Sequence, residues 1–187
     1  MTDPKDEMIF ETALKRQVDV RVKHRFVILA LVAALWIGAT DCQAHTLRGR
    51  VVSVIDGDTI SVVDASNHLD RIRLAAIDAP ERGQPYSQVS RRALAARVLH
   101  RDVTVLWSTH DRYHRIVGKV TIDGVDVNLA QVADGMAWHY RFYQREQSRD
   151  DARAYATAEA WARKRGIGLW ADTRPVPPWT FRHERAE

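Results

Sequence analysis

The chain has 187 residues, of which 45% are hydrophobic and 28% charged, with a net charge of +4. This composition supports a hydrophobic core and excludes disorder of the whole chain, and the length suits one domain of ordinary size with an appendage. The mild basicity is compatible with a polyanionic partner, although an ordinary basic surface explains it equally well.

An uncharged apolar run at residues 26–39 follows a basic flank at residues 21–25. A basic flank, an apolar run and then small residues are typical of a secretory signal peptide, and this run is shorter than the roughly 20 residues that a membrane span needs. We predict cleavage after Ala44, which makes residues 1–44 a leader and His45 the mature N-terminus. The alternative is an uncleaved membrane anchor through the same run, and both interpretations predict a folded part outside the cytoplasm.

The single cysteine, Cys42, also lies in this leader. The mature chain then has no cysteine, which excludes disulfide bonds, thiol catalysis and zinc–thiolate sites there. The 25 residues before the apolar run are unusual for a signal peptide. They are either a long leader or the result of a start codon assigned too early, with Met8 as the alternative start.

Three strands are expected at the start of the folded part, where apolar residues alternate with polar ones. They cover residues 46–55, 59–64 and 71–77. Asp56-Gly57 makes a tight turn between the first two strands. A loop punctuated by Pro80 and Pro85 then leads into a helix at residues 87–100, where apolar residues recur at helical spacing.

Two more strands are expected at residues 103–107 and 116–122, and a hairpin turn follows them at Asp123-Gly124. Five short strands with one helix inserted after the third resemble the OB-fold barrel. The five predicted strands therefore indicate a single small barrel.

Two further helices follow the strands. The first, at residues 128–134, is short and ends before Gly135. The second is alanine-rich, begins after a capping box that Ser148 opens, and ends near Arg165. The predicted fold class is therefore α+β, mainly β: a five-stranded OB-fold barrel with about three helices, behind an N-terminal signal or anchor segment.

Prolines dominate the start of the C-terminal segment, at Pro175, Pro177 and Pro178. Such a run cannot be a helix or a central strand. Residues 173–187 are therefore expected to form a Pro-rich tail outside the domain at residues 45–172. We interpret the tail as an extended arm whose docking residues are Trp179 and Phe181.

Three charged blocks lie at the ends of apolar segments: D-G-D-T at residues 56–59, R-L-A-A-I-D-A-P-E at 73–81 and D-R-Y-H-R at 111–115. They contain three carboxylates of interest, Asp58, Asp78 and Glu81, and two arginines, Arg73 and Arg115. Carboxylates bind hard divalent cations, and arginines grip phosphate groups through a planar fork of donors. A cation, a base and two guanidiniums suit the attack of water on a phosphodiester.

In order and spacing these blocks resemble the staphylococcal nuclease (thermonuclease) family, and the resemblance extends over about residues 47–170. A lone D-G-D-T would be weak, because Asp-Gly is a common turn. Three blocks in order, with every charged position filled, are specific. A further block from Val127 to Trp170 fits the C-terminal half of the family, whereas His114 departs from the glycine that the family usually has.

The resemblance implies an OB-fold and calcium-dependent hydrolysis of DNA and RNA to 3′-phosphate products. It implies roles for the following residues: Asp58, Asp78 and the backbone carbonyl of Ala79 as calcium ligands, Glu81 as general base, Arg73 and Arg115 at the scissile phosphate, and Tyr113 and Tyr143 at the nucleotide. Another pocket tyrosine of the family falls on Arg141, which leaves that contact open. In the aromatic run around these positions, we expect Trp138 to serve packing.

Two other functions are compatible with parts of the sequence. The first is an OB-fold module that binds single strands with a silent site; such degenerate domains of the family lose the charged set, which this chain keeps. The second is a membrane-anchored interaction protein tethered through residues 26–39. The histidines at 110, 114 and 139 follow no standard zinc spacing. We expect a monomer that is exported to the periplasm or the medium.

Overall fold

The computed structural model describes residues 44–185, apart from the side chain of Tyr143. The predicted leader, with the apolar run at residues 26–39 and Cys42, lies outside the described residues. Across residues 44–185, the structure contains no helix with the length and apolar character that crossing a membrane requires.

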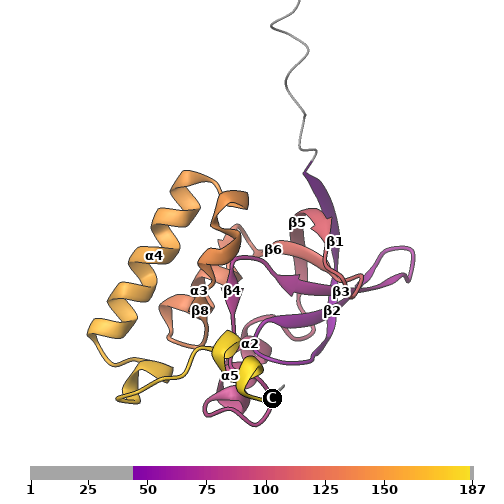
Figure 1. Cartoon of the computed structure of the whole chain (residues 1–187). Coiled ribbons are helices and arrows are strands. Elements are labelled where there is room, and N and C mark those ends of the chain that lie inside the picture. Colours follow the sequence, from indigo (N-terminus) through magenta and orange to yellow (C-terminus); the bar gives the residue numbers. More distant parts are fainter. Residues whose placement is uncertain (1–43, 186–187) are drawn as a thin grey trace, which may run out of the picture. The chain divides into compact units, whose positions relative to one another are not determined.

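Five strands form a closed barrel (Figure 1). They are β1 (His45–Val54), β2 (Thr59–Asp64), β3 (Leu69–Leu74), β5 (Asp102–His110) and β6 (Ile116–Ile122). Antiparallel pairing gives the order β3-β2-β1-β5-β6, and a parallel pairing of β3 with β6 closes the ring. The predicted five-stranded α+β barrel is therefore confirmed.

Short strands and helices complete the domain. The strands are β4 (Ile77–Asp78), which pairs with β8 (Trp138–His139), and β7 (Val125–Asp126), which pairs with β6. The α-helices are α2 (Ser87–Val98), α3 (Val127–Ala133), α4 (Arg149–Lys164) and α5 (Pro178–Glu184), and the 3-10 helices are η1 (Arg141–Glu146) and η2 (Gly168–Ala171). The described residues thus hold four α-helices, one more than expected.

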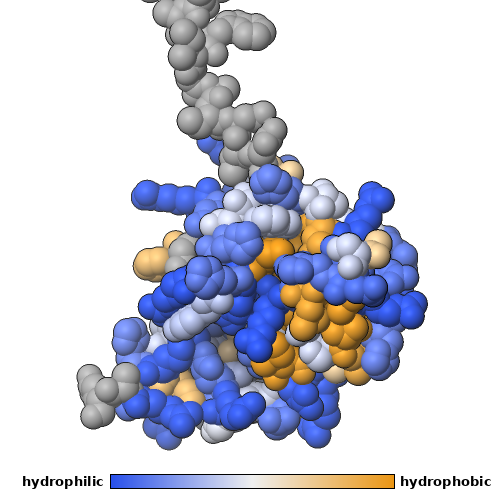
Figure 2. All heavy atoms as spheres, turned by 90° about the vertical axis from the view of Figure 1, so that its right-hand side faces the viewer, coloured by the Kyte–Doolittle hydropathy of each residue, from blue (hydrophilic) through white to orange (hydrophobic). Residues whose placement is uncertain are grey.

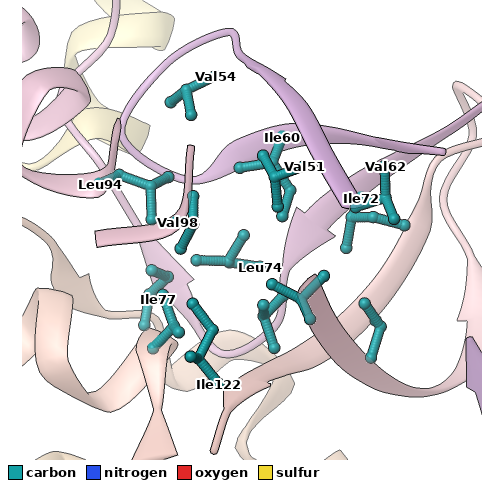
Figure 3. Close-up of a cluster of buried hydrophobic side chains, with 14 of the residues drawn as sticks. Val51, Val54, Ile60, Val62, Ile72, Leu74, Ile77, Leu94, Val98 and Ile122 are labelled. Atoms are coloured by element: carbon teal, nitrogen blue, oxygen red, sulfur yellow. The ribbon is translucent and has the colours of Figure 1, made fainter. Parts of the chain in front are cut away.

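Aliphatic side chains fill the barrel, and α2 closes one part of it. Leu94 and Val98 of α2 are fully buried and lie near Ile60 and Leu74 of the strands (Figure 3). Burial of each such side chain contributes about 1.5–3 kcal/mol. A Cβ at Gly118 of β6 would overlap a neighbouring strand, which explains a glycine in the middle of a strand.

Apolar side chains also reach the surface on the barrel side of the domain. Figure 2 shows them as a patch within a hydrophilic surface. Exposed members of the barrel strands are Val52, Leu69 and Leu106. Apolar atoms make up much of every protein surface, so we assign no function to this patch.

The third strand is shorter than the sequence predicts. Residues 71–77 were expected to form one strand, but β3 ends at Leu74 and the chain changes partner. Ala76 takes a left-handed backbone conformation with φ of 62°, and Ile77–Asp78 then pairs with β8. The Asn128 amide donates to the carbonyl of Ala75 at 3.0 Å and so holds this break. The break directs the chain that carries Asp78 away from the barrel wall.

The prediction of an extended C-terminal arm is partly wrong. Residues 175–177 lie in no helix or strand, with Pro177 in an extended conformation, and a helix begins at Pro178. Proline is tolerated there because the N–H that it lacks has no partner in the first turn of a helix. Trp179 docks as predicted, with its ring 5.5 Å from that of Trp138 and 5.3 Å from that of Tyr140. The segment is therefore folded against the domain instead of standing out as an arm.

Candidate active site

The turn between β1 and β2 is wedged between two helices. Asp56 Oδ1 accepts a hydrogen bond from the backbone N–H of Asp58 at 3.0 Å, which is ordinary turn chemistry. A Cβ at Gly57 would overlap Ser90 Oγ of α2. The side chain of Gln131 from α3 donates to the Gly57 carbonyl at 2.9 Å. These contacts fix the turn and leave Asp58 to point elsewhere.

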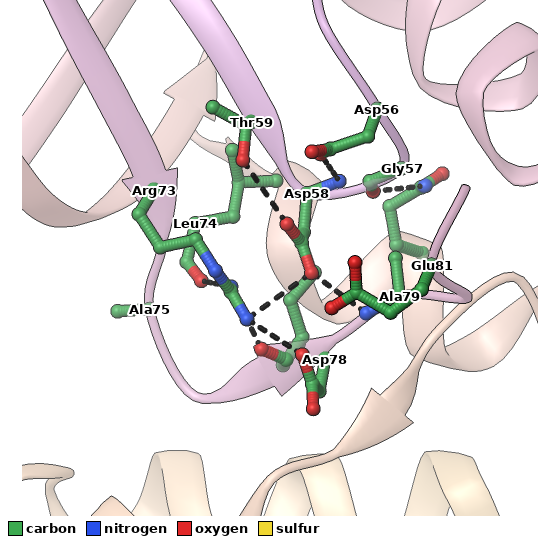
Figure 4. Close-up of polar contacts among 12 residues, drawn as sticks. Asp56, Gly57, Asp58, Thr59, Arg73, Leu74, Ala75, Asp78, Ala79 and Glu81 are labelled. Carbon is green, nitrogen blue, oxygen red and sulfur yellow. Dashed lines mark hydrogen bonds and ion pairs between the residues drawn. The ribbon is translucent and has the colours of Figure 1, made fainter. Parts of the chain in front are cut away.

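Asp58 reaches across to the segment after β4 (Figure 4). It is buried, and its Oδ2 accepts from the backbone N–H of Ala79 at 2.7 Å. Its Oδ1 accepts from the hydroxyl of Thr59 at 3.2 Å. The carboxylate therefore joins two segments that are 21 residues apart.

Asp78 lies at the end of β4 and is almost fully buried. Burial raises its pKa, and the nearby charge of Asp58 raises it further, while ion pairs with Arg73 and Arg182 oppose the rise. The pKa of Asp56 is also raised, to about 7, by burial and by the charge of Asp58. Negative charge is thus crowded here, which is the condition that favours binding of a cation.

Arg73 lies between the two buried carboxylates. Its Nη2 is 3.1 Å from Asp58 Oδ2 and 2.9 Å from Asp78 Oδ1. Its Nη1 donates to the carbonyls of Leu74 and Ile77 at 2.7 and 2.8 Å. One guanidinium therefore both neutralises the carboxylates and holds the break between β3 and β4, as Figure 4 shows.

Glu81 stands after Pro80 at the start of the loop before α2 and is half-buried. Its backbone N–H donates to Gln84 Oε1 at 2.9 Å, which fixes the loop locally. Its Oε1 accepts from Arg182 Nη1 at 2.6 Å. In Figure 4 the Glu81 carboxylate points from its loop toward Asp58 and Asp78.

Arg115 closes the turn at residues 111–115. Asp111 accepts from the backbone N–H of Tyr113 and of Arg115, and its Oδ2 accepts from Arg115 Nε at 2.7 Å. Burial alone would raise the pKa of Asp111, but these hydrogen bonds outweigh it and lower that pKa. Arg115 Nη1 donates to Thr59 Oγ1 at 3.3 Å, and this contact brings the second arginine next to the Asp58 side chain.

His114 occupies a position where a glycine is easily explained. Its φ is 59°, in the left-handed region that favours glycine. A residue with a Cβ costs roughly 1–2 kcal/mol there. The hydrogen bonds of Asp111 that surround the turn hold the histidine in this conformation.

Tyr113 and Tyr143 are the two residues predicted to contact the nucleotide. Tyr113 is exposed, and the guanidinium carbons of Arg112 and Arg115 lie 5.1 and 5.6 Å from its ring centre. Tyr143 lies in η1, and its role stays a prediction. Trp138 is buried and packs edge-on against Trp170 at 4.3 Å, as expected for a packing residue.

The residues present fit a hard cation. Oxygens of Asp58 and Asp78 lie within 3.1 Å of one nitrogen of Arg73, so the two carboxylates converge on one point. Ala79 is adjacent, because its N–H binds Asp58. Over residues 44–185 no three His, Cys, Asp or Glu side chains cluster as metal ligands. Two carboxylates, a carbonyl and waters make a loose oxygen shell, which calcium accepts.

One residue of the site was missed by the sequence analysis. Arg182 of α5 lies 104 residues from Asp78 and pairs with it and with Glu81. No local pattern identifies such a partner, because it depends on how α5 packs. The structure thus brings together Asp58, Arg73, Asp78, Glu81 and Arg115 as the blocks predicted, and adds Arg182.

Comparison with known proteins gives the relationships of the chain. The family model described as "Staphylococcal nuclease homologue" matches residues 71–172. The chain is 44% identical over 140 residues to an Escherichia coli protein named "Uncharacterized endonuclease", over 74% of this chain and 87% of that protein. It is 38% identical over 171 residues to the "Micrococcal nuclease" of Shigella flexneri, over 86% of this chain and 95% of that protein.

Proposed function

The chain belongs to the staphylococcal nuclease family, and we propose that it is a calcium-dependent phosphodiesterase that hydrolyses DNA and RNA to 3′-phosphate products. The observation that carries the proposal is the convergence of two buried carboxylates, Asp58 and Asp78, beside Glu81 and two arginines. Carboxylates and guanidiniums at the end of a small barrel are the groups that phosphodiester hydrolysis uses.

Asp58, Asp78 and the carbonyl of Ala79 would hold the calcium ion. When bound there, the ion supplies positive charge to the scissile phosphate. Asp78 and Asp58 are both rigid, because each is buried and hydrogen-bonded to the backbone or to Arg73. The two carboxylates would therefore move little on binding, whereas Nη2 of Arg73, which lies between them, would give way to the ion.

Glu81 would act on the attacking water. Its carboxylate accepts a proton from the water as the water oxygen forms a bond to phosphorus. The bond from phosphorus to the 5′-oxygen breaks, and that oxygen leaves with the electron pair and takes a proton from solvent water, so the phosphate stays on the 3′ side. Glu81 is half-buried and lies beside Asp78, which suits a general base near the cation.

The arginines would stabilise the charge that develops on the phosphate oxygens. Arg115 is held by Asp111 and Thr59 at the edge of the site, so its planar fork is pre-organised. In the described contacts both Nη groups of Arg73 are used by Asp58, Asp78 and two backbone carbonyls, so its Nε–H is the donor left for a phosphate. Exposed Tyr113 and, by prediction, Tyr143 would contact the nucleotide.

We also propose that the protein is exported. The basic flank and the apolar run at residues 26–39 support this proposal, and β1 begins at His45, directly after the predicted cleavage point. Intact-mass measurement of the native protein tests it. A mature N-terminus at or near His45 is expected, whereas a membrane-bound chain that keeps residues 26–39 would overturn cleavage.

The test of the activity uses the full-length chain and labelled single- and double-stranded DNA and RNA. Cleavage should require calcium, stop with a calcium chelator, and leave 3′-phosphate ends. Glu81→Gln should lose turnover and keep the melting temperature, because the side chain is half exposed and opens no cavity. Binding of the strands without cleavage by the wild type would instead favour a silent binding module.

A further inference from the structure

The guanidinium of Arg182 bridges two carboxylates of the proposed site. Its Nη2 donates to Asp78 Oδ2 at 2.9 Å, and its Nη1 lies 3.2 Å from Asp78 Oδ1 and 2.6 Å from Glu81 Oε1. Asp78 is thus held through both oxygens, and Glu81 through one. Among the described residues, Arg182 is the cation that forms an ion pair with Glu81.

Two further contacts hold the C-terminal segment against the loop that carries Glu81. Gln84 is buried, and its Nε2 donates to the carbonyl of Val176 at 2.6 Å while its Oε1 accepts from the N–H of Glu81. The ring of Trp179 packs against those of Trp138 and Tyr140. The helix that carries Arg182 is therefore docked by polar and aromatic contacts, independently of the ion pairs.

Arg182 does not occupy the point between Asp58 and Asp78 where the proposed cation would bind. The two ligands Asp58 and Asp78 converge on Nη2 of Arg73, whereas Arg182 contacts Asp78 and Glu81. A cation between the aspartates would take the place of Arg73 Nη2, whereas no described contact joins Arg182 to Asp58. The described contacts of the Glu81 side chain use Oε1, so Oε2 remains for a water molecule.

We propose that Arg182 is a positioning residue, which fixes the carboxylate of Glu81 relative to Asp78, and that residues 175–184 belong to the active site. The proposal rests on the function proposed above. A half-exposed glutamate on a loop has several rotamers, and a fork bound to two carboxylates at once restricts them to one. Misplacement of a catalytic group by about 1 Å can cost on the order of 100-fold in rate.

The experiment compares Arg182→Gln, Arg182→Lys, Glu81→Gln and the double variant Arg182→Gln/Glu81→Gln in the full-length chain. Arg174→Gln is the matched control, since it removes the same charge from an exposed position of the same segment. The measurements are kcat and KM on a labelled oligonucleotide at saturating calcium, calcium affinity by calorimetry, and hydrogen exchange of the amides at residues 81–86.

We expect Arg182→Gln to lower kcat about 10- to 100-fold with little change in KM or calcium affinity, and Arg182→Lys to recover part of the loss. Exchange at residues 81–86 should accelerate. In the Glu81→Gln background, Arg182→Gln should cost no further rate, because residues that act as a unit are not additive. Arg174→Gln should match the wild type in every measurement.

Three results would overturn the proposal: a normal kcat in Arg182→Gln, a loss that adds fully to that of Glu81→Gln, or a raised calcium affinity with no loss of rate. The third would make Arg182 a competitor of the cation. If Arg182→Gln fails to fold, Arg182→Lys must reproduce the fall in kcat for the proposal to stand. A wild type without nuclease activity would refute the proposed function instead, whatever the variants do.

Discussion

The substitution Asp58→Asn separates the chemistry of the site from the stability of the fold. An asparagine has the shape of the aspartate, and its carbonyl oxygen can still accept from the N–H of Ala79. Its amide can donate to the hydroxyl of Thr59, which lies 3.2 Å from the other carboxylate oxygen. The hydrogen bonds are therefore kept, and one buried negative charge is removed.

Two opposed effects set the change in the free energy of unfolding that Asp58→Asn causes in the absence of calcium. The variant loses the attraction between Asp58 and Arg73 at 3.1 Å and loses the repulsion of Asp58 with Asp56 and Asp78. Each is on the order of 1–4 kcal/mol at such distances near a protein surface. Because they have opposite signs, the free energy of unfolding without calcium should stay within about 1 kcal/mol of the wild type.

Calcium should then distinguish the two proteins. At a free concentration of about 100 times Kd, a ligand stabilises the protein that binds it by about 2.7 kcal/mol. In a domain of this size that corresponds to a rise in melting temperature of roughly 5–10 °C. The wild type should show this rise, and the variant should show none, because one of its two carboxylate ligands is gone.

Thermal unfolding of both proteins, with calcium and with chelator, measures these shifts, and magnesium serves as the comparison. A loose shell of two carboxylates, a carbonyl and waters should give a smaller shift with magnesium, which demands tighter octahedral geometry. An equal calcium shift in the variant would refute the cation site. A loss of several kcal/mol without calcium would show that Asp58 is chiefly structural.

Three other substitutions test the surrounding structure. Arg115→Lys keeps the charge but loses the fork toward Asp111 and Thr59, so turnover should fall by about 100-fold or more, as steady-state rates would report. Tyr155→Phe removes the hydrogen bonds of a buried hydroxyl to Asp126 and should lower the free energy of unfolding by about 1–2 kcal/mol, measured by denaturant titration, with normal nuclease rates. Asp111 has a lowered pKa in the fold, so its stabilisation is present above the unfolded pKa of about 3.9 and is lost as pH falls through the folded pKa. Asp111→Asn should therefore be less stable than the wild type at pH 7, and the melting temperatures should begin to converge as pH falls below about 4 and coincide only below the lowered folded pKa.

Much of the barrel could be predicted from short apolar segments between turn signals. The bounds of β2 and β6 agree with the sequence pattern: every second residue of Ile116–Ile122 is buried, whereas Thr59–Val62 are all buried. The end of β3 could not be predicted in the same way. The chain leaves the barrel at Ala76, where Asn128 and the partner strand β8 hold it, and such contacts depend on distant parts of the chain.

Helix α5 is a second feature that the sequence pattern does not predict. It spans Pro178–Glu184, too short for a periodic signal, and a helix of this length is marginal by itself in water. Its formation depends on Trp179, which packs against Trp138 and Tyr140. A run of prolines excludes a helix interior, but it does not exclude a helix that begins at the last of them.

The residues of the site could be predicted better than their partners. The charged blocks indicate Asp58 and Asp78 as partners, and the structure brings them together. Asp58 stands directly before β2, whereas Asp78 ends β4, which pairs with β8, so they meet through the Asp58 contact with Ala79 and not through strand pairing. The contacts of Arg73 with the carbonyls of Leu74 and Ile77 exist only because the chain breaks between β3 and β4. The same holds for Arg182, whose place is fixed by packing and by no motif.

The energetics of this cluster give an independent reason to consider it functional. Buried ion pairs contribute little net stability, because removing two charges from water costs about as much as their attraction returns. The aliphatic core around Leu74 and Ile60 stabilises the barrel without them. A domain that buries Asp58 and Asp78 with Arg73 therefore gains little from them as structure. A near-neutral effect of Asp58→Asn on unfolding, together with loss of calcium binding, would show that the charges serve chemistry.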